Sequence, residues 1–195
     1  MLWFFIVMVA YMLGSVPSGV ILTKILGYGD LRRVGSGNIG ATNVMRVGGL
    51  RIAGVVWLLD MIKAMLAVWL GAYFGGPVAG AWCGFAAIVG HCFPVWLRFH
   101  GGKGVSCMFG IMLAINPVIF VVCGIEWLIV ALGGGKSSAG AMVVFLLFPI
   151  LGFVMNPGVG WAFLAMSVLC VVRHVDNIRR LAHGAESSIE WRWRK

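Results

Sequence analysis

Apolar runs long enough to cross a bilayer are the feature that most constrains this 195-residue chain. Leu2 to Thr23, Ile52 to Phe74 and Val78 to Leu97 each approach the ~20 residues that a helix needs to span ~30 Å of hydrocarbon. Only 11% of the residues are charged and 61% are hydrophobic, whereas soluble domains carry about 25% charged residues. A water-soluble globule is therefore excluded, and the solvent of this chain is lipid.

Four shorter apolar segments follow, separated by turns rich in glycine, proline and asparagine. They are residues 105–115, 118–132, 139–155 and 159–172. The first of them covers only about 16 Å as a helix, so hydropathy alone does not decide whether it is a separate crossing.

The distribution of basic residues decides the number of crossings. Cytoplasmic loops collect Lys and Arg, and seven crossings place 14 of the 15 basic residues on one side, with Lys63 inside the second span. Merging residues 105–132 into one helix would put the basic tail on the opposite side. We predict an all-α integral membrane protein, a seven-helix transmembrane bundle that forms one domain over residues 1–195. Its N-terminus is expected outside and its C-terminus in the cytoplasm.

The terminal segments and the cysteines narrow the class further. Residues 1–9 contain no Lys or Arg, so we expect a retained span and not a cleaved signal peptide. The five cysteines form no C-x-x-C pair and no cluster with histidine, which predicts neither a disulfide framework nor a zinc site. Residues 191–195, Trp-Arg-Trp-Arg-Lys, are typical of an interfacial anchor.

The polar stretch after the first span is dense in hydrogen-bond donors. Residues 35–46 read Gly-Ser-Gly-Asn-Ile-Gly-Ala-Thr-Asn-Val-Met-Arg. The glycines let backbone N–H groups converge on an anion, and Arg46 supplies a planar charged group that suits phosphate. If residues 42–46 are helical, Thr42 and Asn43 share a face with Arg46. The alternative is a flexible surface loop with a helix cap.

A second polar segment, Gly101-Gly102-Lys103-Gly104, combines close backbone approach with a point charge. It is not a Walker A loop, because Gly104 stands where Ser or Thr is required and Leu97 stands at the first glycine position. The alternative is a turn before a membrane helix that carries one cytoplasmic lysine.

The third polar segment follows the last span. Within residues 173–180, His174 and Asn177 lie one helical turn apart and can point into one pocket. For Arg179 and Arg180 we favour binding to anionic lipid headgroups. Glu186 is expected to pair with one of the nearby cations.

Two ionisable residues, Asp60 and Lys63, lie at positions i and i+3 near the middle of the second span. Charged groups at this depth are costly unless they are paired or face a wet cavity. We favour a structural ion pair over a direct role in chemistry, because both lie away from the level of the three polar segments.

Taken together, these motifs resemble those of the bacterial acyl-phosphate:glycerol-3-phosphate acyltransferase family. The similarity lies in residues 36–46, in Gly90-His-Cys-Phe-Pro94 with residues 100–104, and in Arg173-His174 with Asn177-Ile178. It implies a seven-helix inner-membrane enzyme with its site facing the cytoplasm. Such an enzyme transfers a fatty acyl group from acyl phosphate to the sn-1 hydroxyl of glycerol 3-phosphate, which yields lysophosphatidic acid and phosphate.

The resemblance and the residue chemistry together predict the site. The residues expected to bind two phosphates and orient the hydroxyl are Ser36, Arg46, Lys103, His174 and Asn177; the further substrate-binding residues are Gly37, Asn38, Thr42, Asn43, Gly101, Gly102 and Gly104. A phosphate oxygen or His174 takes the proton. No histidine is followed by Asp five positions later, so the His-x-x-x-x-Asp signature of other glycerolipid acyltransferases is absent.

The predicted partners are acyl phosphate, glycerol 3-phosphate and membrane lipids, and neither a cofactor, a metal, an acyl carrier nor nucleic acid is expected. The main alternative is a membrane transporter or channel for phosphorylated small molecules, which would need access from both sides. A lipid-binding scaffold would explain the basic tail but would leave residues 36–46 without a role.

Overall fold

The computed structural model describes residues 1–189, and every regular element in that range is helical. The predicted anchor at residues 191–195 lies outside the described residues. The α-helices are α1 (Leu2–Ser15), α2 (Ser18–Ile25), α3 (Ala41–Gly48), α4 (Leu50–Cys92), α5 (Val105–Ile115), α6 (Pro117–Gly134), α7 (Ser137–Met155), α8 (Gly160–Arg173) and α9 (Val175–Ala182). Short 3-10 turns occur at η1 (Leu31–Arg33), η2 (Val95–Leu97) and η3 (Pro157–Val159).

The first predicted span, residues 2–23, is broken between α1 and α2 at Val16-Pro17. Pro17 has no N–H to donate and its ring obstructs the preceding turn, so a continuous helix is disfavoured there. A Cβ on Gly14 would lie 2.0 Å from the carbonyl oxygen of Ala87. The glycine therefore allows α1 to pack closely along α4, in the small-residue manner of membrane helices.

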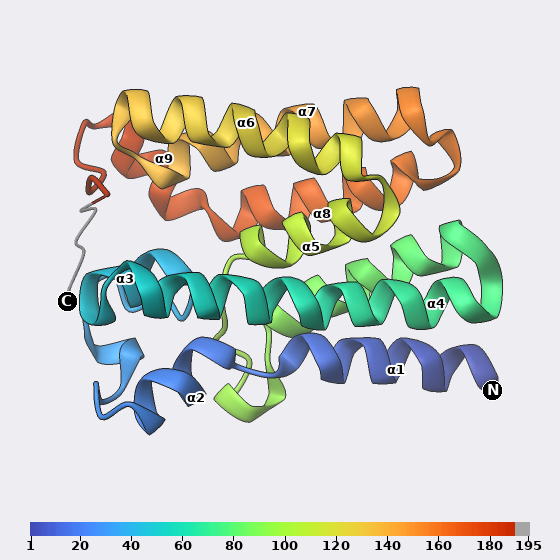
Figure 1. The fold of residues 1–195 in the computed structure, drawn as a ribbon, viewed down its shortest axis with the longest axis horizontal. Coiled ribbons are helices and arrows are strands. Elements are labelled where there is room, and N and C mark those ends of the chain that lie inside the picture. The colour runs from blue at the N-terminus through green and yellow to red at the C-terminus, as the bar shows by residue number, and fades with distance from the viewer. Residues whose placement is uncertain (190–195) are drawn as a thin grey trace.

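Helix α4 is a hairpin of two arms. Gly75 and Gly76 have non-helical backbone angles, and Gly76 has a φ of +75°. The chain reverses at this point and the two arms run side by side (Figure 1). These arms correspond to the predicted segments 52–74 and 78–97.

The later helices agree closely with the apolar segments of the sequence. Short α5 lies between α4 and the group formed by α6, α7 and α8 (Figure 1). Stacked rings of Phe148 and Phe163, 3.9 Å between centroids, join α7 to α8 in the core. By length and composition, four helical segments of the described residues can cross a membrane, and a fifth can if bent α8–α9 is counted as one. Residues 41–97, from α3 through α4 to η2, are a single segment in this count.

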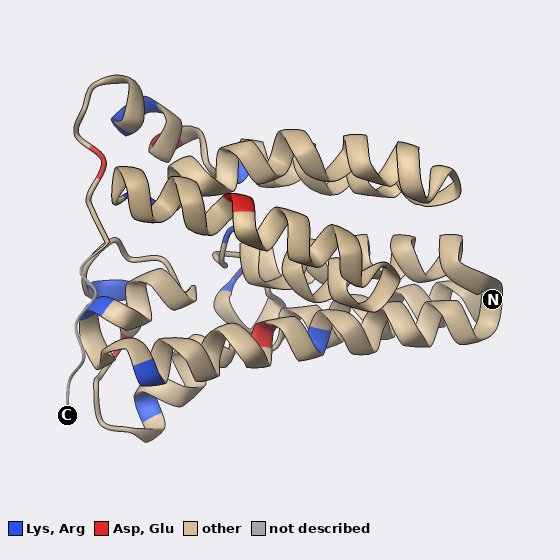
Figure 2. Cartoon of the chain, turned by 45° about the horizontal axis from the view of Figure 1, so that its top comes forward, with Lys and Arg blue, Asp and Glu red and all other residues tan. Residues whose placement is uncertain are grey.

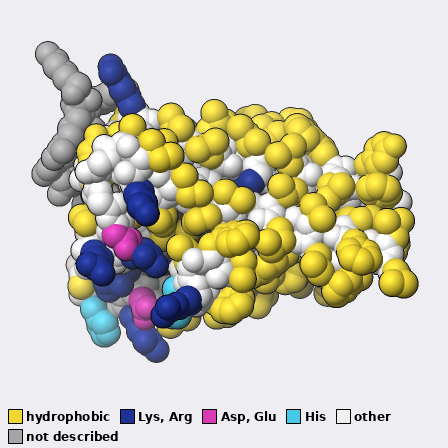
Figure 3. All heavy atoms as spheres, turned by 90° about the horizontal axis from the view of Figure 1, so that it is seen from below, with side chains coloured by type: hydrophobic (Ala, Val, Ile, Leu, Met, Phe, Trp, Pro, Cys, Tyr) yellow, Lys and Arg dark blue, Asp and Glu magenta, His cyan; other side chains and the backbone are white. Residues whose placement is uncertain are grey.

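Polar and apolar surfaces are segregated along the bundle. Large hydrophobic side chains are exposed on most helices, and only 17% of the apolar window in α6 is buried within the protein. Most charged side chains gather at one end, near α3 and α9, while hydrophobic side chains predominate over the rest of the visible surface (Figures 2 and 3). We call the charged end the polar end, and the end with the Gly75-Gly76 turn the opposite end.

Candidate functional site

A cavity of about 580 Å³ opens at the polar end and extends between α3, α4, α5, α6, α7 and α9. All five predicted phosphate-binding and orienting residues line it, although they come from three separate parts of the chain: Ser36, Arg46, Lys103, His174 and Asn177. Asn38, Thr42, Asn43 and Gly104 line it too, whereas Gly37, Gly101 and Gly102 do not.

The loop before α3 is held by the buried amide of Asn43. Its Oδ1 accepts from the backbone N–H of Ser36 at 2.9 Å, and its Nδ2 donates to the carbonyls of Val34 and Leu31 at 2.9 and 3.2 Å. These three bonds use most of the hydrogen-bonding groups of the Asn43 side chain within the protein. Asn43 therefore shapes the loop that presents Ser36 to the cavity.

Helix α3 carries the first cation of the site. Thr42, Asn43 and Arg46 all line the cavity, which confirms the predicted shared face. Nη2 of Arg46 donates to Oγ of Ser187 at 2.6 Å, and Oγ1 of Thr42 lies 3.3 Å from Oγ of Ser137. The half-buried guanidinium is thus bonded to the segment after α9, and its other N–H groups remain available to a ligand in the cavity.

The glycine loop from Gly101 to Gly104 uses its amides differently from a phosphate-binding nest. The N–H of Gly101 donates to the carbonyl of Cys92 at 3.1 Å, and that of Gly102 donates to the carbonyl of His91 at 3.0 Å. Two glycines therefore fasten the loop to the end of α4, and the cation of Lys103 is the part that reaches the cavity.

Lys103 and Asn177 meet across the cavity. Nζ of Lys103 donates to Oδ1 of Asn177. Burial, and then the nearby positive charge of Arg180, lowers the pKa of Lys103 from its ordinary value. A partly desolvated ammonium interacts with an anion more strongly than one in bulk water, because the local dielectric constant is lower.

His174 lies at the junction of α8 and α9, buried and edge-on to the ring of Phe145. Its Nδ1 is 2.8 Å from the carbonyl of Cys170, so Nδ1 carries the proton and Nε2 is left as an acceptor. Burial lowers the pKa of His174 to about 4. The ring is therefore neutral near pH 7 and suited to accept a hydrogen bond from a hydroxyl group.

Glu186 links three elements beside these residues. It pairs with Arg180 at 2.6 Å, as predicted, and it also accepts from Nδ2 of Asn177 at 2.6 Å and from Oγ of Ser138 at 2.8 Å. Burial alone would raise the pKa of this carboxyl, but the three donors lower it overall. Ser138 was not among the predicted site residues; its only signal in the sequence was a Ser-Ser pair at the start of an apolar helix.

The inner wall of the cavity is apolar and was not predicted residue by residue. It comes from the first arm of α4, from α5 and from α6, and its members are Trp57, Phe109, Phe120, Ile125 and Leu128. One cavity therefore joins a cationic mouth to a hydrophobic channel between helices.

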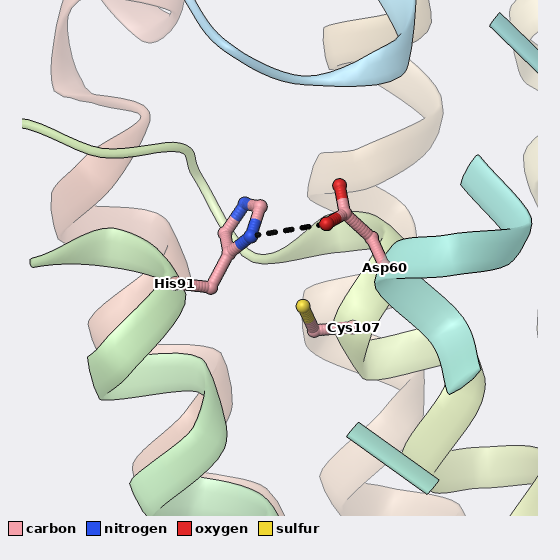
Figure 4. Close-up of side chains that lie close together, drawn as sticks. All are labelled: Asp60, His91 and Cys107. Carbon is pink, nitrogen blue, oxygen red and sulfur yellow. Dashed lines mark ion pairs between the residues drawn. The ribbon is translucent and has the colours of Figure 1, made fainter. Parts of the chain in front are cut away.

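A second polar cluster lies deeper in the bundle. Asp60, His91 and Cys107 are close enough for one atom from each to ligate a metal ion (Figure 4). The ammonium of Lys63 is 2.7 Å from Oδ1 of Asp60 and 3.0 Å from Nδ1 of His91. Lys63 is therefore the cation of this cluster, and the predicted ion pair with Asp60 is confirmed.

The chain is similar to glycerol-3-phosphate acyltransferases over nearly its whole length. The family model of that description matches residues 4–184. Relatives of the same name from Rhizobium etli and Burkholderia vietnamiensis are 43% and 44% identical, and each match covers 93% of this chain and 88% of the relative.

Two solved structures have the same fold. They are crystal structures of PlsY (YgiH), an integral membrane glycerol 3-phosphate acyltransferase, in a glycerol 3-phosphate form and a lysophosphatidic acid form. The first has a TM-score of 0.91 at 31% identity and covers 97% of this chain and 96% of its own. The second has a TM-score of 0.90 at 29% identity and covers 98% and 97%.

Proposed function

This chain belongs to the glycerol-3-phosphate acyltransferase family and is a multi-pass membrane acyltransferase of phospholipid synthesis, and from this premise we propose its donor, site and orientation. The proposed reaction transfers a fatty acyl group from acyl phosphate to the sn-1 hydroxyl of glycerol 3-phosphate. Its products are lysophosphatidic acid and inorganic phosphate. The observation that carries the proposal is the single cavity with cations at its mouth and an apolar inner wall. Such a cavity suits phosphate groups and an acyl chain at the same time.

The phosphate groups are assigned to the mouth of the cavity. Arg46 and Lys103 neutralise phosphate charge, and Ser36 and Asn177 supply neutral hydrogen-bonding groups. Thr42, Asn38 and Gly104 complete this part of the lining. Because acyl phosphate is an activated mixed anhydride, positioning and charge neutralisation lower the barrier without a protein nucleophile.

The hydroxyl of glycerol 3-phosphate attacks the acyl carbonyl carbon, a C–O ester bond forms, and the bond from the carbonyl carbon to the phosphate oxygen breaks. We assign to Nε2 of His174 the role of accepting the hydrogen bond of the attacking hydroxyl; the bond of Nδ1 to Cys170 and the position of His174 in the cavity wall support this assignment. Either this nitrogen or an oxygen of the departing phosphate takes the proton.

The acyl chain is assigned to the apolar wall that α4, α5 and α6 form. A donor that enters from the membrane needs no acyl carrier or coenzyme A pocket. No metal or cofactor takes part in the proposed steps.

We place the polar end in the cytoplasm of a bacterial inner membrane, with the N-terminus outside. Seven crossings by one transmembrane domain then require α4 to cross twice and α5 to cross as a short helix. Support comes from the charges gathered at one end and from the positive-inside rule. A transporter is not favoured, because the chain belongs to an acyltransferase family.

The proposed reaction is tested with purified protein, acyl phosphate and glycerol 3-phosphate. We expect phosphate release in equal amount to lysophosphatidic acid, and no product when acyl-coenzyme A or acyl carrier protein replaces acyl phosphate. Acylation with those donors but not with verified acyl phosphate would reject the proposed donor. No acylation with any donor would reject the activity itself.

A further inference from the structure

We propose that Asp60, Lys63 and His91 form a positioning network that fixes the glycine loop and, through it, Lys103. Lys103 and His91 line the cavity, whereas Asp60 and Lys63 do not. The inference rests on the proposed role of Lys103 in binding phosphate. The buried Asp60–Lys63 pair then affects the reaction through the position of Lys103, without contacting the substrate.

The Lys63 ammonium contacts three separate parts of the fold. It donates hydrogen bonds to the carbonyl of Val16 at 2.7 Å and to Nδ1 of His91 at 3.0 Å. It also forms an ion pair with Oδ1 of Asp60, at 2.7 Å. Lys63 therefore joins the break between α1 and α2 to both arms of α4.

The contact with Lys63 also determines which ring nitrogen of His91 carries the proton. Because the ammonium donates to Nδ1, the proton of the neutral imidazole is on Nε2. Asp60, Lys63 and His91 are 1%, 6% and 4% exposed. The ring orientation is therefore determined by buried charge and by packing, with little access of water.

His91 contacts the glycine loop in two ways. Its carbonyl accepts from the N–H of Gly102 at 3.0 Å. A Cβ added to Gly102 would lie 2.0 Å from Nε2 of His91, so the ring edge lies directly against this glycine. Gly102 precedes Lys103, and a shift of the ring moves the point from which Lys103 extends.

The other side of the loop is held by Arg173 of α8. Its Nη2 and Nε donate to the carbonyls of Gly101 and Gly102, both at 3.2 Å. The loop thus lies between His91 and Arg173, with its amides bonded to α4 and its carbonyls to α8. Displacement of the His91 ring removes the side-chain contact that positions Gly102 and leaves the loop held by Arg173 and by backbone bonds to α4. Lys103 then loses its fixed position opposite Asn177.

The test compares Lys63→Met with the double variant Asp60→Leu/Lys63→Met. The single variant leaves a buried unpaired carboxylate and should lose both stability and activity. The double variant removes both charges, so we expect its Tm to return to within a few degrees of wild type. We expect its kcat/KM for glycerol 3-phosphate to remain at least tenfold reduced. Recovery of both quantities would show that the pair is structural only and would overturn the proposal.

A second variant, His91→Gln, keeps the Asp60–Lys63 pair and removes the ring against Gly102. We expect a tenfold lower kcat/KM here too, and wild-type kinetics would overturn the proposal even if the double variant does not fold. The variants are repeated in Lys103→Met, where a network that acts through Lys103 has no further effect. Additive losses in that background would instead indicate a general structural defect.

Asn156→Leu is the matched control, because it removes a partly buried polar contact at the opposite end. The rise in Tm on addition of glycerol 3-phosphate provides a readout independent of turnover. If wild type shows this rise but no acyl transfer, the proposed reaction fails. In that case, loss of the rise in Tm in the double variant and in His91→Gln would support the network proposal, and an unchanged rise would overturn it.

Discussion

The polar end and the opposite end of this bundle are made by the same apolar helices, but their connections differ in length and chemistry. At the opposite end the connections are short, and the side chain of Asn116 caps α6 and donates to Asn156 at 2.7 Å. At the polar end, two long connections, residues 26–40 and 93–104, converge on one cavity with Arg46, Lys103 and His174 in its wall. The comparison suggests that short turns close the bundle, while long polar connections create its site.

The largest effect should follow loss of the Lys103 charge. Lys103→Met removes the ammonium that faces the cavity and bonds to Asn177, so we expect kcat/KM to fall by about 1,000-fold, the upper range for loss of one preorganised charge-stabilising donor. Initial rates of phosphate release measure this change. A loss below about threefold would contradict the assignment of a phosphate group to the mouth of the cavity.

Replacement of His174 should have the next largest effect. If Nε2 is the base, His174→Ala lowers kcat by about 100-fold or more, whereas near-normal turnover at saturating substrate would assign the proton to a phosphate oxygen. Because the pKa of His174 is lowered to about 4, wild type and His174→Asn should share their inflections between pH 5 and 8. An inflection found only in wild type would show that the ring titrates there.

The acyl-binding wall can be probed at Gly124 of α6. This residue lines the cavity, and a Cβ there would meet only Cε1 of Phe109, at 4.0 Å. Gly124→Leu therefore projects a side chain into the apolar channel. We expect kcat/KM to fall by roughly tenfold for a 16-carbon donor, because a contact in a hydrophobic pocket contributes ~1–3 kcal/mol. We expect a smaller fall for a short donor. Equal losses for both donors would place the chain elsewhere.

Local sequence patterns were sufficient for most of the fold. The apolar segments predicted at 118–132, 139–155 and 159–172 correspond to α6, α7 and α8 within two residues at each end. The broken first span follows from Pro17. These features depend on hydrophobicity and backbone chemistry, which each segment carries in itself.

The sequence did not show which distant segments contact each other in the fold. The pattern Gly101-Gly102 indicates close backbone approach, but only the structure shows that these amides approach α4 and not a ligand. The Asn43 side chain likewise bonds to the loop before α3 and not to a ligand. The apolar wall could not be recognised, because its residues look the same in sequence as those that face lipid.

A smaller effect, on stability, is expected at Glu186. Its pKa is lowered in the folded protein, so its stabilising contribution is present above the ordinary value of about 4.3 and is lost as the pH falls through the lower folded value. Glu186→Gln should therefore lower Tm at pH 7 by a few degrees, because the ion pair of Glu186 with the half-exposed Arg180 contributes about 1 kcal/mol to stability. The gap should close in thermal melts below about pH 4; a gap that widens would contradict this account.

The smallest effect on activity should come from the opposite end. Asn156→Leu removes the bond to Asn116, which joins the turn before α6 to the turn after α7. A side-chain hydrogen bond contributes about 1 kcal/mol, so Tm should fall by a few degrees. Activity at a temperature well below Tm should stay within about twofold of wild type, because the side chains of Asn116 and Asn156 bond only to each other and to the N–H of Val118 among the described residues, and none of these three residues lines the cavity. A large loss of kcat/KM with an intact fold would mean that the two ends are coupled, and that the turns at the opposite end set the separation of α5, α6 and α7 on which the acyl channel depends.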